Sequence, residues 1–560
     1  MKKFLVLYII LLTSWALQAQ QTQDSVRTEV INVTRSFEPK VQDAYKLDVN
    51  PEIDKLSEQK IPVDFHIQSV PVASTFTPEK GGMANFQTGS ITEDVYKSYV
   101  ALGVGNYTQI TGDAYVYYPV SDHFGSALRL SHYSSQGQEN DDDISYDPFY
   151  HTSLDLLFDY KKDKTRWNFD LGYNGHINYV KDNLSFMPLV PVEINTYEHK
   201  ENNFVLKADG SFKDIYLQDV HFDYNNYWDG FDNSEHRVHL LGNFVIPVSD
   251  LDLKLGVQSD WVSGDAGQVE YIQDNPATEI TYSNSDFGLL PAVQIENDKL
   301  VINAGAKIFY QNQDSIYNNL QIIPDVNLNF NLIYEKLTVF AGVTGDFHQN
   351  SQAELSANNP YLSPDNMMIP TLTPYDIFGG FNGAFSSSFS YEVKMGYRDI
   401  QNYPFYNYKE GALVTYAVFY DDMKQSYFDT SINIGIGKKF DLKLNLLYLQ
   451  NDPDHLRKAL FVPEFTFKSI LIFRPTDKLN FNVELHSVDN RNYASGTDDY
   501  ISGYTDLNLG VRYNINKQFT AFLQTNNLLG ESYEIYYAYP VQKFQIMAGA
   551  TYRFDIPVIK

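Results

Sequence analysis

The chain has 560 residues, no Cys, 15 % aromatic residues and a formal net charge of −28. The absence of Cys excludes disulfides, thiolate metal sites, Cys nucleophiles and a lipid anchor built on an N-terminal Cys. The acidic balance argues against a nucleic-acid partner, because phosphates require a surface rich in Lys and Arg.

Residues 1–19 have the pattern of a secretory signal peptide. Lys2 and Lys3 precede an apolar run over 4–12, and Ala19 offers a small residue at the expected cleavage point. A helix that spans a bilayer needs about 20 apolar residues, so this run is too short for an anchor. We therefore expect an exported protein whose signal peptide is removed.

Residues 20–96 form a distinct N-terminal segment. The stretch 40–60 is charged and without periodicity, and four Pro residues between 51 and 78 interrupt any long element. Within the segment, Thr28–Thr34 (TEVINVT) alternates and predicts one short strand. We interpret it as an N-terminal segment that is periplasmic or inserted, like a plug, into the lumen of the domain that follows. It is too short for a large core of its own, but it could fold against the wall of that domain.

From residue 97 onward the dominant period is two residues, which is typical of half-buried strands. In the stretch 544–554 one face carries Phe544, Ile546, Ala548, Ala550, Tyr552 and Phe554. The stretches 325–332, 479–486 and 506–515 show the same alternation. The opposite face of these strands is rich in Asn, Asp, Lys, Arg and Glu, which indicates a watery or plugged interior and an apolar exterior in contact with lipid.

Short polar pairs and long loops alternate between the predicted strands. The pairs suit tight hairpins and are Ser121-Asp122, Asp163-Lys164, Ser249-Asp250, Asn297-Asp298, Glu335-Lys336, Lys438-Lys439, Asp477-Lys478 and Asn516-Lys517. The predicted long loops are 135–147, 181–198, 266–282, 350–371, 403–412, 450–461 and 487–501. This asymmetry is typical of outer-membrane proteins, with short turns in the periplasm and long loops outside the cell.

These patterns predict an all-β fold: a transmembrane antiparallel β-barrel of about 22 strands over 97–554, in the outer membrane of a Gram-negative bacterium. A short extension, 555–560, follows it. The alternative is a soluble propeller or tandem sandwich. It requires a fixed internal repeat or an apolar inner face, and the sequence shows neither.

Acidic clusters and His residues are the candidates for chemistry. The run 139–143 and the pairs Asp421-Asp422 and Asp498-Asp499 lack the spacing of a calcium loop, and we interpret them as solvated loops. His236 and His239 are three residues apart, so on a strand they face opposite sides and do not share a metal. We expect no catalytic residues, no metal and no cofactor, and the sequence contains no GxSxG motif.

Aromatic residues gather toward the predicted strand ends. Trp167, Trp228 and Trp261, with many Tyr residues, fit girdles at the two membrane interfaces. Plain core aromatics are the alternative, and they would not cluster at strand ends.

Three segments carry a family resemblance: 397–407 (YRDIQNYPFYN), 418–452 and 522–554. The last of these contains Asn527-Leu528, then Tyr533, Pro540 and a final strand that ends at Phe554. They resemble the barrel of TonB-dependent receptors of the Bacteroidota type, and this resemblance covers roughly 97–554. It implies a 22-stranded barrel that moves a solute across the outer membrane with energy supplied through TonB.

The N-terminal segment departs from that family. The resemblance implies a plug domain of well over a hundred residues before the barrel, whereas residues 20–96 are far fewer. The strand Thr28, Glu29, Val30, Ile31, Asn32, Val33 and Thr34 resembles either the opening strand of such a plug or a coupling segment that pairs with TonB by strand addition. An ordinary structural strand is the other interpretation.

Three functions therefore remain open. The chain is a transporter with a reduced plug, or a plugless barrel that serves as a subunit of an outer-membrane assembly or secretion complex. The third function is a passive channel gated by 20–96. Outer-membrane lipid is a partner in all three, and TonB or other periplasmic or outer-membrane subunits are the expected protein partners.

Overall fold

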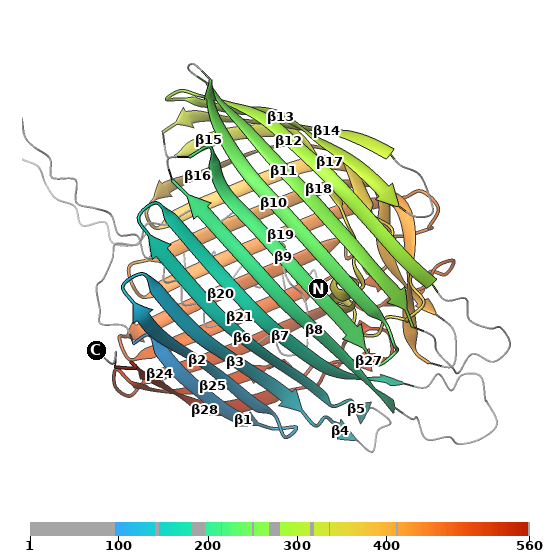
Figure 1. Cartoon of the computed structure of the whole chain (residues 1–560). Coiled ribbons are helices and arrows are strands. Elements are labelled where there is room, and N and C mark those ends of the chain that lie inside the picture. Colours follow the sequence, from blue (N-terminus) through green and yellow to red (C-terminus); the bar gives the residue numbers. More distant parts are fainter. Residues whose placement is uncertain are drawn as a thin grey trace, which may run out of the picture. The chain divides into compact units, whose positions relative to one another are not determined.

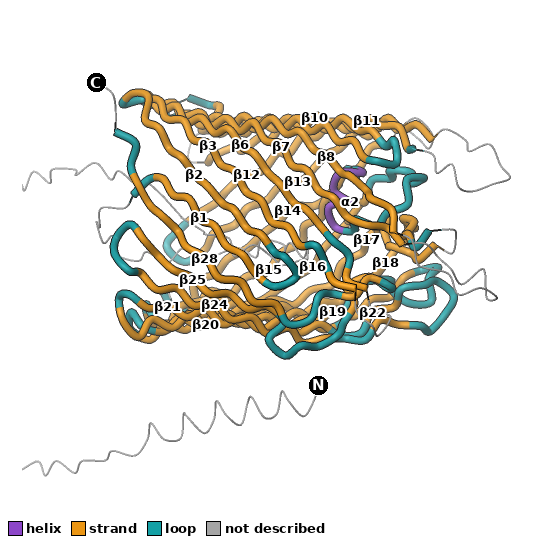
Figure 2. Tube along the Cα trace, turned by 90° about the horizontal axis from the view of Figure 1, so that it is seen from below, coloured by secondary structure: helices purple, strands orange, loops and turns teal. Residues whose placement is uncertain are grey.

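The computed structural model describes residues 96–139, 145–181, 196–213, 215–248, 251–267, 280–313, 319–334, 336–409 and 413–557. The predicted signal peptide 1–19 and the strand Thr28–Thr34 lie outside these residues. Every long element is a strand, and one short helix, α2 (Gln352–Asn358), lies between two strands (Figures 1 and 2). No helix in the described part of the chain is long and apolar enough to cross a membrane.

Twenty-two strands form one closed antiparallel sheet, which confirms the predicted all-β barrel and its strand number. The strands are β1 (Ser98–Gly105), β2 (Ile110–Ser121), β3 (Phe124–Ser135), β6 (Phe149–Lys162), β7 (Thr165–Lys181), β8 (Thr196–Phe212), β9 (Leu217–Asp229), β10 (Ser234–Val248), β11 (Leu251–Ala266), β12 (Ile280–Glu296), β13 (Leu300–Gln313), β14 (Asn319–Ile333), β15 (Leu337–His348), β16 (Thr371–Ser386), β17 (Phe389–Lys409), β18 (Thr415–Ile436), β19 (Phe440–Pro453), β20 (Phe465–Thr476), β21 (Leu479–Val488), β24 (Tyr504–Asn514), β25 (Phe519–Asn526) and β28 (Gln545–Phe554). Each strand pairs with the next along the chain, so the topology is a simple meander.

The barrel closes where the first strand meets the last. Ser98 of β1 lies opposite Phe554 of β28, and the pairing continues to Gly105 opposite Met547. Gly549 lets the two strands approach, since a Cβ atom there would meet the carbonyl oxygen of Leu102 at 2.2 Å. Closure leaves no free sheet edge, which is what a strand structure in a bilayer requires.

The two faces of the wall follow the alternation of the sequence. In β14, Val326, Leu328 and Phe330 point outward and are 37–40 % exposed, while Asn327 points inward and donates to Asp325. In β28, Ile546 and Tyr552 point outward and Gln545 is buried on the other side. The apolar face is therefore the exterior and the polar face is the lumen, as predicted.

The connections differ between the two ends of the barrel. One end, which we call the turn end, carries the short links, for example Asp163–Lys164 and Asp477–Lys478. The other, the loop end, carries the long links. The predicted loop 403–412 was wrong, because β17 continues to Lys409. The predicted loop 450–461 starts too early, because β19 continues to Pro453.

The wall is not equally tall all the way round. Strands β17 and β18 have 21 and 22 residues, whereas β1 and β25 have 8 each. Aromatic residues mark both ends: Trp167 lies near the turn end, and Trp228 and Trp261 lie toward the loop end at about 40 % exposure. This arrangement fits interfacial girdles rather than a buried core.

Candidate functional site: the loop-filled mouth of the barrel

The candidate site is the loop end, where the connections fold inward over the lumen. The loop 349–370, which joins β15 to β16, carries α2 (purple in Figure 2). Its residues Gln349, Asn350, Ser351 and Gln352 are polar, yet they are only 2–4 % exposed. Buried polar groups usually find partners. Asn350 donates to the carbonyl oxygen of Ile369 and to Thr371, and the backbone N–H of Gln352 donates to Glu235 of the wall, whereas among the described residues the buried side chain of Gln349 has no hydrogen-bond partner.

Helix α2 is held at its N-terminus by a carboxylate of the wall. Ser351 caps the helix by accepting from the backbone N–H of Glu354 at 3.2 Å. The carboxylate of Glu235, on β10, accepts from the backbone N–H groups of Gln352 at 2.7 Å and Ala353 at 3.2 Å. These amides have no acceptor within the helix, so Glu235 satisfies donors that would otherwise be buried without a partner.

A second polar cluster holds the middle of α2. The Tyr227 hydroxyl lies 3.2 Å from Ser356 Oγ, 3.0 Å from Asp229 Oδ2 and 3.3 Å from Glu201 Oε1. His199 Nε2 lies 3.5 Å from the same carboxylate oxygen of Asp229. All these side chains are buried. The wall thus presents fixed carboxylates and a Tyr to the loop, and breaking one contact leaves a buried charge or hydroxyl without its partner.

Glu354 of α2 has two charged partners, one on β10 and one at the end of β15. His348 Nε2 lies 2.9 Å from Glu354 Oε2, and Arg237 Nη1 lies 3.6 Å from the same oxygen. Burial favours the neutral acid, but the hydrogen bond and charge of His348 outweigh it. The pKa of Glu354 is therefore held below its ordinary value.

Tyr residues join the loop 349–370 to the loop 527–544, which connects β25 to β28. The rings of Tyr361 and Tyr539 stack with centroids 3.5 Å apart. The Tyr539 hydroxyl donates to the carbonyl oxygen of Val414 at 2.6 Å, and that of Tyr416 donates to the carbonyl oxygen of Tyr537 at 2.9 Å. Three separate loops are thereby packed into one apolar cluster that also buries Leu355, Leu362 and Met368.

Asp421 anchors a further loop, 454–464. Its carboxylate accepts from the backbone N–H groups of His455 at 2.9 Å and Leu456 at 2.8 Å, and it lies 2.7 Å from His455 Nδ1. The interpretation of Asp421-Asp422 as a solvated loop was therefore wrong. Asp421 belongs to β18 and is 3 % exposed.

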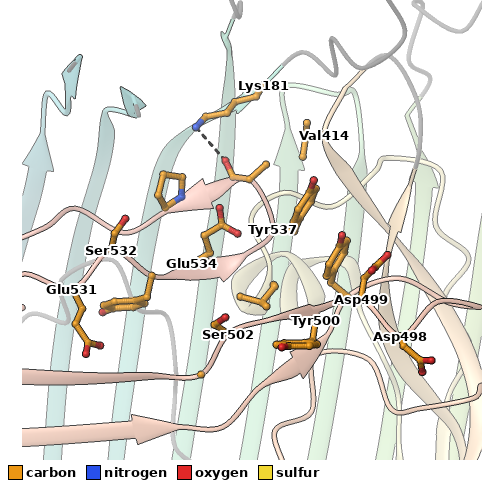
Figure 3. A pocket seen from close by; sticks show the side chains of 16 residues that line it. Lys181, Val414, Asp498, Asp499, Tyr500, Ser502, Glu531, Ser532, Glu534 and Tyr537 are labelled. Carbon is orange, nitrogen blue, oxygen red and sulfur yellow. Dashed lines mark hydrogen bonds between the residues drawn. The ribbon is translucent and has the colours of Figure 1, made fainter. Parts of the chain in front are cut away.

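A cavity of about 980 Å³ remains between two short hairpins of the mouth. One hairpin is β22 (Arg491–Asn492) with β23 (Tyr500–Ile501), and the other is β26 (Glu534–Tyr536) with β27 (Tyr539–Pro540). Figure 3 shows Asp498, Asp499 and Tyr500 on one side and Glu531 and Glu534 on the other. Ligand sites of proteins usually measure about 300–1,000 Å³, so this cavity has the size of a binding site.

The structure tests the candidates from the sequence unevenly. The predicted coupling strand Thr28–Thr34 and most of the acidic run 139–143 lie outside the described residues. His236 contacts Tyr224 and His239 contacts Asp223, so the two imidazoles do not meet, as predicted. Among the residues that the structure describes, no group of three His, Asp or Glu side chains could hold a metal ion.

The sequence did not single out the residues that build the mouth. Glu235, Tyr227, Tyr361 and Tyr539 carry no motif, and the loop 527–544 was interpreted only through its family resemblance. The one usable signal is the density of Tyr over 533–539, where four of seven residues are Tyr.

Comparison with known proteins supports the fold. No family model and no curated protein matches the sequence. Among solved structures, the chain is similar to the FrpB iron transporter of Neisseria meningitidis, with a TM-score of 0.62, 11 % identity, and 83 % of this chain and 82 % of that chain covered.

Two further receptors show the same likeness. The ferric-catecholate import receptor Fiu of E. coli K12 gives a TM-score of 0.61 at 9 % identity, with 82 % of each chain covered. The pyoverdine outer membrane receptor FpvA of Pseudomonas aeruginosa PAO1 gives 0.61 at 11 % identity, with 82 % of this chain and 79 % of that chain covered. These neighbours are TonB-dependent receptors. At such identities the likeness establishes a shared barrel fold, while function must be argued from the site.

Proposed function

We propose that this protein is an outer-membrane barrel that moves a solute through its lumen, with the loop end outside the cell and the turn end in the periplasm. The supporting observation is the mouth itself: loops fold inward, are fastened to wall carboxylates, and leave a ligand-sized cavity. Glu235 bound to the start of α2 and the stack of Tyr361 on Tyr539 are the main attachments.

The width of the barrel requires that something, such as this loop, fills its lumen. A barrel of 22 strands encloses a lumen wide enough for an aqueous channel or a plug. An open hole of that width would destroy the permeability barrier, so the lumen must be filled. The loop 349–370 fills part of the loop end, and we propose that it controls entry.

The second part of this proposal concerns the N-terminal segment 20–96 and the periplasmic side of the lumen. After removal of the signal peptide 1–19, we propose that it occupies the periplasmic side of the lumen as a reduced plug. The strand Thr28–Thr34 is proposed as the segment that pairs with TonB, by analogy with receptors of the same barrel fold. The sequence resembles receptors of the Bacteroidota type, and we propose that this barrel is of that type.

Electrical conductance tests transport directly. The full chain and a form without 21–94 are each purified from native outer membranes through a tag after Lys560 and inserted into planar bilayers. We expect the full chain to conduct little and the shortened form to conduct in large steps. If both forms stay silent and a fixed set of partner proteins co-purifies in stoichiometric amount, the protein is a subunit of an assembly and the transport proposal fails.

The same comparison separates a transporter from a passive channel. A passive channel would give steady conductance in the full chain without any energy source. Energy-coupled uptake predicts instead that substitution of Val30 and Asn32 by Pro, which prevents strand pairing, abolishes uptake in cells and leaves the barrel intact.

A further inference from the structure

The cavity at the mouth has an unbalanced charge. Its lining includes four carboxylates and one ammonium group: Asp498, Asp499, Glu531, Glu534 and Lys181. Asp499 and Tyr500 come from the 489–503 loop, which joins β21 to β24, and Glu531 and Glu534 come from the 527–544 loop. The carboxylates thus face the cavity from two loops that are unrelated in sequence (Figure 3).

The single ammonium group, that of Lys181, acts electrostatically on Glu534 and is also held by groups outside the lining. Lys181 Nζ lies 3.0 Å from Asp147 Oδ2, outside the lining, and it donates to the carbonyl oxygen of Ala538 at 3.2 Å. Asp498 is paired with Arg457 at 3.0 Å and with Lys458 at 3.8 Å, so its charge is balanced. Among the described residues, no ion pair is formed by Asp499, Glu531 or Glu534.

A buried guanidinium, that of Arg491, lies outside the cavity lining and donates to backbone carbonyl oxygens. Arg491 is 5 % exposed, and it donates to the backbone carbonyl oxygens of Glu534 at 2.7 Å and Ile535 at 3.0 Å. It fixes the hairpin of β26 and is not part of the cavity lining. Arg491 and Lys181 act electrostatically on Glu534, so the excess of negative charge at the open face of the cavity comes from Asp499 and Glu531.

Aromatic rings complete the lining. Tyr493 and Tyr537 stack in parallel, with centroids 4.3 Å apart and planes 3° apart. Tyr500 is 57 % exposed and makes no described ring contact. The face of a Tyr ring carries partial negative charge and attracts ammonium and guanidinium groups within about 6 Å.

We propose that this cavity binds an organic cation, that is, a solute or short peptide that carries amine or guanidinium groups. Carboxylates from two loops would pair with the charged groups, and the Tyr rings would cover the carbon chain. An anionic solute would meet like charges on both sides, so the same residues select against it. The inference rests on the proposed function, because it names the class of solute that the transporter takes from outside.

Titration calorimetry on the purified full chain tests the ligand class. The probes are tri-arginine, tri-glutamate and maltotriose, which are similar in length and differ in charge. We expect binding of tri-arginine, weaker binding at higher ionic strength, and no binding of the other two probes. Equal or tighter binding of tri-glutamate or maltotriose overturns the proposal, and so does the absence of tri-arginine binding.

Two double variants of the chain locate the site. Asp499→Asn with Glu531→Gln removes two exposed carboxylates and retains the acceptor that Glu531 offers to the backbone N–H of Thr505. We expect it to weaken tri-arginine binding about three- to tenfold, as exposed charges do. The matched control, Asp298→Asn with Asp477→Asn, neutralises two exposed residues at the turn end and leaves binding unchanged. Equal loss in both variants, or no loss in the first, overturns the assignment to this cavity.

The Tyr rings give an independent readout. Tyr500→Ala removes an exposed ring without a described hydrogen bond, so folding is unaffected, and we expect about a threefold weaker affinity. The outcomes also separate the two proposals. If the conductance test shows a gated lumen but tri-arginine does not bind, only the ligand class is wrong. If tri-arginine binds to a chain that never conducts, the cavity is a binding site and the transport proposal is wrong.

Discussion

The ring of Tyr361 stacks on the ring of Tyr539 at a centroid distance of 3.5 Å, across 178 residues of chain. This contact joins the two loops that close the mouth. It belongs to a packed cluster in which Tyr539 also donates to Val414 and accepts the backbone N–H of Lys181 at 3.3 Å.

Tyr539→Ala should therefore release the two loops without unfolding the barrel. Truncation of a buried aromatic residue costs about 3–5 kcal/mol of packing, and here the loss falls on the loop cluster. We expect faster hydrogen exchange over 349–370 and 527–544 and unchanged exchange in the strands. Tyr216→Ala is the control, because Tyr216 is 65 % exposed near the turn end. Protection that stays native in the Tyr539 variant would contradict this role.

Glu235 controls how firmly α2 is attached to the wall. Glu235→Ala leaves the amides of Gln352 and Ala353 and the hydroxyl of Tyr282 without their acceptor. Each buried group left unpaired costs about 1–3 kcal/mol, so we expect the loop to detach and the conductance of the form without 21–94 to rise. Glu296→Gln, at an exposed position of the turn end, is the control. An unchanged conductance would show that the loop does not narrow the lumen.

The loop 349–370 contains two carboxylates, Asp365 and Glu354, whose stabilising contacts should be lost in acid. Burial raises the pKa of Asp365, but hydrogen bonds from Lys409 and Ser363 outweigh it, and the folded pKa lies below the ordinary value. Glu354 is shifted in the same direction by His348. A lowered folded pKa means that the ionised acid stabilises the loop above its unfolded pKa of about 4, and that this stability is lost as the pH falls through the folded pKa.

Limited proteolysis of the 349–370 loop between about pH 3 and pH 7 measures this effect. Both carboxylates are partly exposed, so each contributes less than about 1 kcal/mol after screening by water. Asp365→Asn should make cleavage at neutral pH resemble that of the wild type in acid, and should flatten its pH dependence. Cleavage that slows as the pH falls would reverse the sign and refute the assignment.

The two faces of the wall predict opposite responses to the same substitution. Val326 lies at the middle of β14 on the outer face, and Asn327 is the next residue on the inner face. Val326→Arg places a charge in the hydrocarbon region and should reduce the free energy of unfolding in lipid by about 2–4 kcal/mol. Asn327→Arg enters the polar lumen beside Asp325 and should change it by less than about 1 kcal/mol. Similar losses in urea unfolding from liposomes would contradict the orientation of the wall.

The strands could be predicted because their signal is local. Alternation in β14 or β28 follows from lipid on one side and the lumen on the other. The polarity of each residue therefore indicates which of the two faces it lies on. The predicted end of β17 was wrong because the sequence over 403–409 has no clear alternation, yet these residues continue the pairing with β18 up to Lys409 opposite Thr415. The interpretation of Asp421 was wrong because its partners are backbone amides of another loop, which the sequence around Asp421 does not reveal.

The mouth could not be predicted, because its contacts are not local. Glu235 and Gln352 are 117 residues apart, and nothing near either residue marks the pair. Tyr361 and Tyr539 look like any other Tyr in a chain that contains 43 of them. A Tyr in a girdle and a Tyr in a packed loop have the same sequence neighbours, so only the folded chain separates the two roles.

The uneven height of the wall has a consequence for the surrounding lipid. A strand that crosses a bilayer at the usual tilt needs about 9–11 residues, and β1 and β25, beside the closure, have only 8 each. Lipid next to this seam must shorten so that the polar ends of these strands stay outside the hydrocarbon, while lipid beside β17 and β18 has its full length. We therefore expect the bilayer to be thinner beside the seam of the first and last strands than beside β17 and β18.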